Sequence, residues 1–99
     1  MQKSEAKGPG VHLVITRLGF ERLARSAGVP PTPLWVNAGV LTSEELDELR
    51  LKGLDVSIFN RPIDPQDAAA IAVAAATVRQ HHPHDIVWVE YSVDFGQDT

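Results

Sequence analysis

Hydrophobic and polar residues alternate along this chain with two periods, one of two residues and one of about 3.6 residues. The shorter period is typical of β-strands, whose side chains point to opposite faces in turn, and the longer one of helices with a single apolar face. Strands are predicted at residues 11–17, 34–38, 54–60 and 85–95, the second being a short apolar run, and helices at residues 20–27, 42–52 and 65–81. The predicted order is therefore β-α-β-α-β-α-β.

Residues at the ends of these segments support the boundaries. Thr42 and Glu45 have the spacing of a capping box, in which the two residues hydrogen-bond each other at the start of a helix. Asp64 followed by Pro65 predicts another helix start, with the acid as N-cap and the proline in the first helical position. Gly53 suits the end of the second helix, because glycine adopts a positive φ without strain.

Strands that alternate with helices over short connections form βαβ units with parallel strands. We therefore predict one small α/β domain over residues 11–95, with a four-stranded, mainly parallel sheet and two to three helices. A mixed sheet, with the first or last strand antiparallel, is the main alternative. Residues 1–10 are predicted to form a disordered tail and residues 96–99 a flexible end, because neither contains an apolar stretch to bury.

One face of the predicted sheet is expected to be only partly covered, because polar side chains recur along it. This face is predicted to contain His12, Thr16, Asp55, Ser57, Glu90 and Ser92, interspersed with Val14, Phe59, Ile86 and Trp88. A strand order of 2-1-3-4 would let the first helix cover part of the face, and otherwise a second chain would have to cover it. The order 1-2-3-4 would place all three helices on the opposite face.

The third helix and the last strand carry much apolar surface for so small a domain. Seven of the nine residues from 68 to 76 are alanine, so this helix either packs closely within the chain or contributes to an oligomer. The last predicted strand is about twice the usual length, and its far half is expected to be an unpaired edge available to another chain. The predicted interaction surface consists of Phe59, Trp88, Glu90, Tyr91 and Phe95.

Composition narrows the class of protein without identifying an activity. The 99 residues include no cysteine, which excludes disulfides and thiolate chemistry, and the net charge of −4 disfavours binding to nucleic acid. Residues 1–30 carry five bases and two acids, whereas residues 31–99 carry four bases and eleven acids. No apolar run is long enough to span a membrane and the first ten residues do not resemble a signal peptide, so a cytoplasmic location is expected.

The chain contains no motif for a dinucleotide, a phosphate loop, a serine nucleophile or a helical zinc site, so no catalytic residue and no cofactor is predicted. In parallel α/β sheets, ligands bind beyond the carboxyl ends of the strands, where helix N-termini point their N–H groups. A site for a small anion or metabolite is therefore predicted from Arg17, Asn37, Gly39, Thr42, Asn60 and Arg61. The alternative is that the asparagines bond to local backbone and the arginines are solvated.

Three histidines lie close together between His81 and Asp85. His82, His84 and Asp85 could converge on a metal ion, with His12 as a remote ligand. We favour the alternative, in which the histidines stabilise the negative end of the preceding helix, and therefore predict no metal site.

The segments Leu34–Gly39 (LWVNAG) and Gly53–Pro62 (GLDVSIFNRP) resemble parts of a small bacterial protein family with no established activity. The resemblance covers most of the chain after Gly10, and it implies no catalytic residue, cofactor or ligand. Similarity of fold would not assign one either. We therefore expect a non-enzymatic protein-interaction or self-associating domain, with a homodimer or a protein partner. The alternative is an anion- or metabolite-binding domain, with or without enzymatic activity, at the carboxyl ends of the strands.

Overall fold

The computed structural model describes residues 10–27 and 32–90, and it confirms the predicted α/β fold with its order of strands and helices along the chain. All strand pairings are parallel, so the mixed sheet is not found in these residues. The strands are β1 (Gly10–Val14), β2 (Leu34–Val36), β3 (Val56–Ile58) and β4 (Ile86–Glu90). The helices are α1 (Arg17–Ala27), α2 (Ser43–Leu51) and α3 (Ala68–His81).

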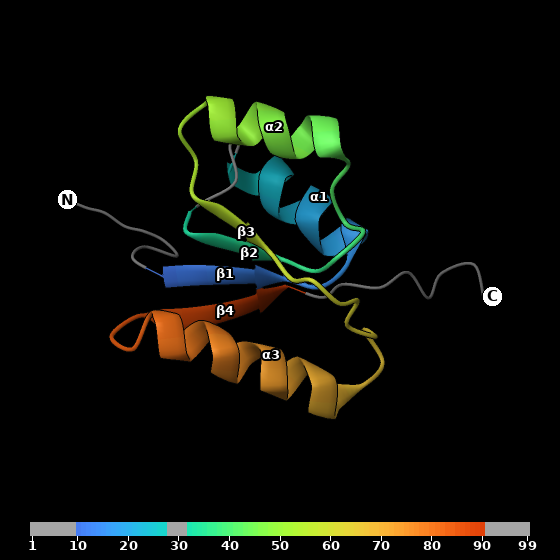
Figure 1. The fold of residues 1–99 in the computed structure, drawn as a ribbon, viewed down its shortest axis with the longest axis vertical. Helices are drawn as coiled ribbons and strands as arrows, with labels where there is room; N and C mark the ends of the chain where they lie inside the picture. The colour runs from blue at the N-terminus through green and yellow to red at the C-terminus, as the bar shows by residue number, and fades with distance from the viewer. Residues whose placement is uncertain (1–9, 28–31, 91–99) are drawn as a thin grey trace.

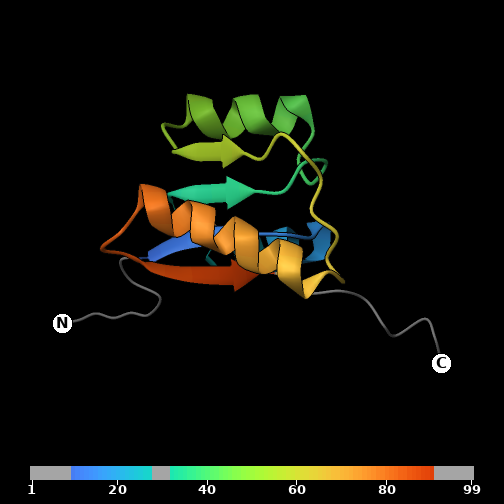
Figure 2. The ribbon, with the colours of Figure 1, turned by 60° about the horizontal axis from the view of Figure 1, so that its bottom comes forward.

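The spatial order of the strands is β3-β2-β1-β4, which differs from both orders weighed from the sequence. Right-handed crossovers from β1 to β2 and from β2 to β3 place α1 and α2 on one face of the sheet. The crossover from β3 to β4 runs back across the sheet and places α3 on the other face. Figure 1 shows α1 and α2 above the sheet and α3 below it, and Figure 2 shows α3 crossing in front of the strands.

The expectation of one partly polar sheet face is wrong, because the polar rows of different strands lie on different faces. His12 is fully buried on the α1 and α2 side, where its ring stacks on Trp88 at 6.4 Å between centroids. Ser57 pairs in register with Trp35, which packs on the α3 side together with Phe59. Helices therefore cover both faces of the sheet. Alternation within a strand separates its two rows of side chains, but it does not show which row shares a face with which row of the neighbouring strand.

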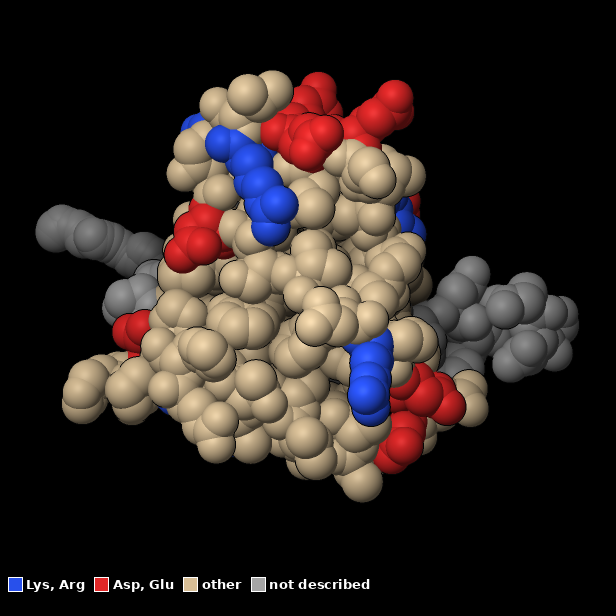
Figure 3. Space-filling model, viewed as in Figure 1, with Lys and Arg blue, Asp and Glu red and all other residues tan. Residues whose placement is uncertain are grey.

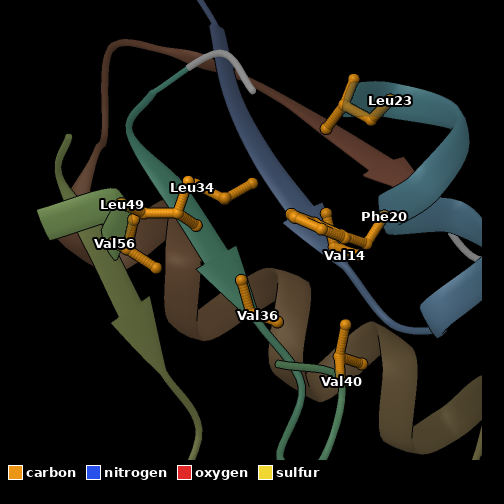
Figure 4. Close-up of a cluster of buried hydrophobic side chains, with 8 residues drawn as sticks. All are labelled: Val14, Phe20, Leu23, Leu34, Val36, Val40, Leu49 and Val56. Carbon is orange, nitrogen blue, oxygen red and sulfur yellow. The ribbon is translucent and has the colours of Figure 1, made fainter. Parts of the chain in front are cut away.

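Two apolar clusters fill the two sides of the sheet. The cluster under α1 and α2 contains Val14, Phe20, Leu23, Leu34, Val36, Val40, Leu49 and Val56 (Figure 4). The cluster under α3 contains Val11, Leu13, Ile15, Ile63, Ala74, Ala75 and Val78. Val11 and Leu13 of β1 belong to the cluster under α3 and Val14 belongs to the other, and this central strand is buried along its whole length.

The ends of α2 and α3 test the capping predictions. The capping box of α2 is confirmed: the Glu45 N–H donates to the Thr42 hydroxyl at 3.1 Å, and the Thr42 N–H donates to the Glu45 carboxylate at 2.9 Å. The predicted helix start at Asp64 is wrong, because α3 begins only after Asp67, which is its N-cap. The Asp64 carboxylate instead accepts a hydrogen bond from the Gln66 N–H at 2.9 Å, which forms a turn before the helix.

The last strand occupies one edge of the sheet. Within the described residues it covers the first half of the segment predicted as a long strand, Ile86–Glu90, and both Tyr91 and Phe95 lie outside those residues. Of the two predicted tails, residues 1–10 and 96–99, all but Gly10 also lie outside them. The assignment of Gly10 to the first tail is wrong, because it is the buried first residue of β1 and pairs with Ile86 of β4. No helix in the described ranges is long and apolar enough to cross a bilayer.

Candidate functional site

Arg17 is the first residue of α1, and its side chain binds carboxylates on both α1 and α2. Its Nη1 and Nη2 atoms donate to the two oxygens of Glu45 at 2.7 and 2.9 Å, and its Nε atom donates to Glu21 at 3.0 Å. Nη1 also donates to the Val40 carbonyl at 3.0 Å. The guanidinium predicted to bind an anion thus already joins two helices of its own chain.

The same contacts favour the ionised form of Glu45. Hydrogen bonds from the Arg17 side chain and the Thr42 backbone lower the pKa of Glu45 from 4.5 to about 2, and the Glu45 contact raises the pKa of Arg17. Because the pKa of Glu45 is lower in the folded chain than in the unfolded one, the contact stabilises the fold fully above about pH 4.5. That stabilisation is lost as the pH falls towards 2.

We expect Glu45→Gln to remove this pH dependence while keeping the capping box, which accepts glutamine. Near neutral pH the variant should unfold at a lower urea concentration than the wild type, by a modest amount because both side chains are partly exposed. The difference should shrink as the pH falls from 4.5 towards 2, where the wild-type carboxyl becomes neutral. Urea midpoints across this range measure it, with the exposed Glu44→Gln as control. A difference in urea midpoint that stays constant with pH would contradict the assignment of this pH dependence to the Glu45 carboxylate.

Asn37 is buried at the end of β2, where it joins three segments of backbone. Its Nδ2 atom donates to the carbonyls of Ile15 and Ile63 at 2.9 and 2.8 Å, and its Oδ1 atom accepts from the Ile63 N–H at 2.8 Å. The side chain therefore ties the end of β1 to the loop that leads into α3. The amide is thus bonded to backbone, but the alternative interpretation is wrong in calling that backbone local, because Ile15 and Ile63 are distant from Asn37 in the sequence.

The other predicted ligand residues divide into two groups. Gly39, with φ of +84°, belongs to the turn between β2 and α2, and the Thr42 hydroxyl caps α2. Asn60 and Arg61 follow β3 and are exposed. No ion pair to Arg61 is found within residues 10–27 and 32–90. The guanidinium of Arg17, in contrast, pairs with Glu21 and Glu45.

The strand order places a crevice between the carboxyl ends of β1 and β4, where α1 and α3 go to opposite faces and where such folds bind ligands. The first turn of α1 fills it. A Cβ atom on Gly19 would lie 2.9 Å from the Glu90 carbonyl oxygen, which also accepts the Ile15 N–H at 2.8 Å. The backbones of α1 and β4 are therefore in contact where a ligand would lie.

The histidines at the end of α3 pack against Trp35. The indole Nε1 donates to His82 Nε2 at 3.2 Å, which places the proton of a neutral imidazole on Nδ1, 3.6 Å from the Asp85 carboxylate. The rings of Trp35 and His81 lie 5.2 Å apart, and His84 is exposed. Within the part of the chain that the structure describes, no three His, Asp or Glu side chains form a group that could hold a metal ion.

The middle of α3 presents an apolar, uncharged side to solvent. We call the exposed residues Ala69, Ala72, Val73 and Ala76 there the α3 outer face; Val73 is 67% exposed. The helix carries no charged residue between Asp67 and Arg79. Figure 3 shows this surface at the bottom of the view as largely tan, with acidic side chains gathered at the end where α3 begins.

A hollow of about 580 Å³ adjoins the α3 outer face. It lies between the loop from Phe59 to Ile63 and α3, and its helix side is formed by Ala70, Val73, Ala74 and Thr77. Its lining is mainly apolar, with the exposed Asn60 and Arg61 as its polar members apart from Thr77. A hollow of about 660 Å³ along α2 differs in character, because carboxylates supply most of its lining.

The residues predicted to form an interaction surface are dispersed. Phe59 lines the hollow beside α3, whereas Trp88 lies on the opposite side of the sheet over Gly10, and Glu90 ends β4 beside α1. Tyr91 and Phe95 are outside the described residues. The prediction did not include Val73, although the absence of charge from residue 68 to residue 78 could have indicated an apolar outer face.

Comparison with protein-family models, with curated proteins and with solved structures finds no match to this chain. The function therefore has to be inferred from the placement and chemistry of its own residues.

Proposed function

We propose that this domain is a protein-interaction module that binds through the α3 outer face and the adjoining hollow. The observation that carries the proposal is Val73, an aliphatic side chain 67% exposed in the middle of an uncharged helix face. Burial of an aliphatic side chain against a partner gains about 1.5 to 3 kcal/mol relative to full exposure. Contiguous apolar surface of this kind is typical of sites where proteins associate.

The competing function, binding of a small anion or metabolite, has narrower support. The side chains of Arg17, Asn37 and Thr42 are hydrogen-bonded within the fold, and the crevice between β1 and β4 is filled by α1. Asn60 and Arg61 remain exposed, and both line the hollow beside α3. An organic anion with an apolar body is therefore the rival occupant of the same surface.

The dye 8-anilinonaphthalene-1-sulfonate, which joins apolar rings to one anionic group, probes this surface in the full chain. We expect it to shift the amide resonances of residues 59–63 and 69–77. Val73→Gln should weaken its binding about fivefold, which corresponds to losing about 1 kcal/mol of apolar contact. Leu51→Gln is the matched control, because Leu51 is 88% exposed on α2, outside the proposed surface.

The pattern of variants separates the two functions. Binding that survives Val73→Gln but is lost in Arg61→Gln would favour the organic-anion site over the protein-interaction surface. Equal binding by the wild type, Val73→Gln and Arg61→Gln would contradict both, since the dye would then bind elsewhere.

A further inference from the structure

A side-chain hydrogen bond ties the end of α3 to the sheet. His82 is the C-cap of α3, and its Nε2 atom accepts from the indole Nε1 of Trp35 at 3.2 Å. Trp35 is the middle residue of β2 and lies 47 residues earlier in the chain. The acceptor of this hydrogen bond is therefore a titratable group, which makes the contact between α3 and β2 sensitive to protonation.

This hydrogen bond exists only while the His82 ring is neutral. An indole N–H can only donate, so Nε2 of His82 has to offer a lone pair, and the ring proton is then on Nδ1. In an imidazolium both ring nitrogens carry hydrogen. Protonation of His82 would therefore set its Nε2–H against the N–H of Trp35, and two donors cannot form a hydrogen bond.

The surroundings of His82 also offer a partner to the charged ring. Its Nδ1 atom lies 3.6 Å from an Asp85 carboxylate oxygen, which is longer than a good hydrogen bond, so this contact can shorten when the ring is charged. His82 also follows the last turn of α3, where the free backbone carbonyls favour a cation. Trp35 thus stabilises the neutral ring and Asp85 the charged one.

The other side chains around Trp35 do not duplicate this role. The Phe59 ring, 5.5 Å from that of Trp35, carries no charge. Within residues 10–27 and 32–90, Asp85 is the one acidic side chain at ion-pairing distance from His82. The remaining titratable or charged side chains near the end of α3 and in the turn after it are exposed: Arg79, His81 and His84.

We propose that His82 is a pH-sensitive switch that exchanges Trp35 for Asp85. When His82 is protonated, its ring leaves the indole and pairs with the Asp85 carboxylate, so α3 loses this hydrogen bond to β2. Histidine suits such a switch because its charge ordinarily changes between pH 5 and pH 8. Phe59 packs on Trp35 and also lines the hollow beside α3, so the switch adjoins the proposed interaction surface without depending on it.

Nitrogen–nitrogen coupling through the hydrogen bond, between Trp35 Nε1 and His82 Nε2, tests the switch by NMR on the full chain from pH 8 to pH 5. We expect the coupling at pH 8 and its loss as the ring resonances of His82 titrate. The indole resonance of Trp35 should shift with the same midpoint. His81→Gln is the matched control, because the His81 ring lies 5.2 Å from that of Trp35, and both changes should persist in it.

Two further variants, each checked for folding by circular dichroism, separate the parts of the proposal. His82→Gln replaces the ring by an amide that does not titrate, so the Trp35 indole resonance should stay constant from pH 8 to pH 5. Asp85→Asn should lower the urea midpoint more at pH 5 than at pH 8, because the carboxylate meets a charged ring only at the lower pH.

Three results would overturn the switch: no coupling at pH 8, a coupling and indole resonance that do not change between pH 8 and pH 5, or an indole resonance that still titrates in His82→Gln. An effect of Asp85→Asn that is equal at both pH values would overturn the transfer of His82 to Asp85. Because none of these measurements uses the hollow or the α3 outer face, their outcome leaves the dye-binding test of the proposed function independent.

Discussion

Asn37→Ala is expected to destabilise the fold by about 3 kcal/mol, because it leaves buried backbone groups without their hydrogen-bond partners. The Asn37 side chain donates to two carbonyls and accepts from the Ile63 N–H, and all three bonds are 2.8 to 2.9 Å long. Alanine cannot replace any of them, and Asn37 is only 5% exposed, so water has little access to the freed groups. The effect should be an early unfolding transition in urea with an unchanged slope.

Asn60→Ala is the matched control, since both asparagines follow a strand but Asn60 is exposed. Its stability should stay within about 0.5 kcal/mol of the wild type. Asn37→Asp should also destabilise strongly, because it directs a carboxylate at two carbonyl oxygens where the amide donates. Wild-type stability in Asn37→Ala would contradict the structural role of Asn37 and revive its assignment to a ligand site.

Gly19→Ala is expected to destabilise by about 2 kcal/mol, within the range for forcing an extra methyl group into packed structure. Its sign makes the prediction specific, because alanine in place of glycine within a helix ordinarily stabilises by up to about 1 kcal/mol. Here the added Cβ would lie 2.9 Å from the Glu90 oxygen and 3.1 Å from the Glu90 carbonyl carbon. Either α1 or the end of β4 would have to move.

Thermal and urea unfolding of Gly19→Ala measure this effect. Arg22→Ala, an exposed position on the same helix, is the control and should stay within about 0.5 kcal/mol of the wild type. A stabilised Gly19→Ala would show that α1 does not close the crevice between β1 and β4, and that crevice would again become a candidate ligand site.

Local patterns predicted the elements of this fold well, because their signals lie within a few residues of each other. The Thr42 and Glu45 capping box and the alternation through β1 are examples. The strand order could not be predicted, since it depends on which face each crossover takes and no local pattern reports that. The same limitation caused Ser57 and His12 to be assigned to one face, although they lie on opposite faces.

The candidate site shows a similar division. The carboxyl ends of the strands could be identified from the sequence. Both Arg17 and Arg61 follow a predicted strand end, so the sequence did not show that one is ion-paired and the other exposed. Glu21 binds Arg17 from one turn further along α1, whereas only the arrangement of α1 and α2 shows that Glu45 also binds it. The run without charge indicated that α3 is apolar, but it did not show which side of the helix faces solvent. The structure shows this side, because Ala74, Ala75 and Val78 are buried against the sheet.

Titration of the unmodified chain with 8-anilinonaphthalene-1-sulfonate tests the central claim most directly, because the dye binds only if the apolar surface around Val73 is accessible. The account predicts that Val73→Gln weakens the binding of the dye about fivefold while Leu51→Gln does not. Equal binding by the wild type, Val73→Gln and Arg61→Gln would contradict it.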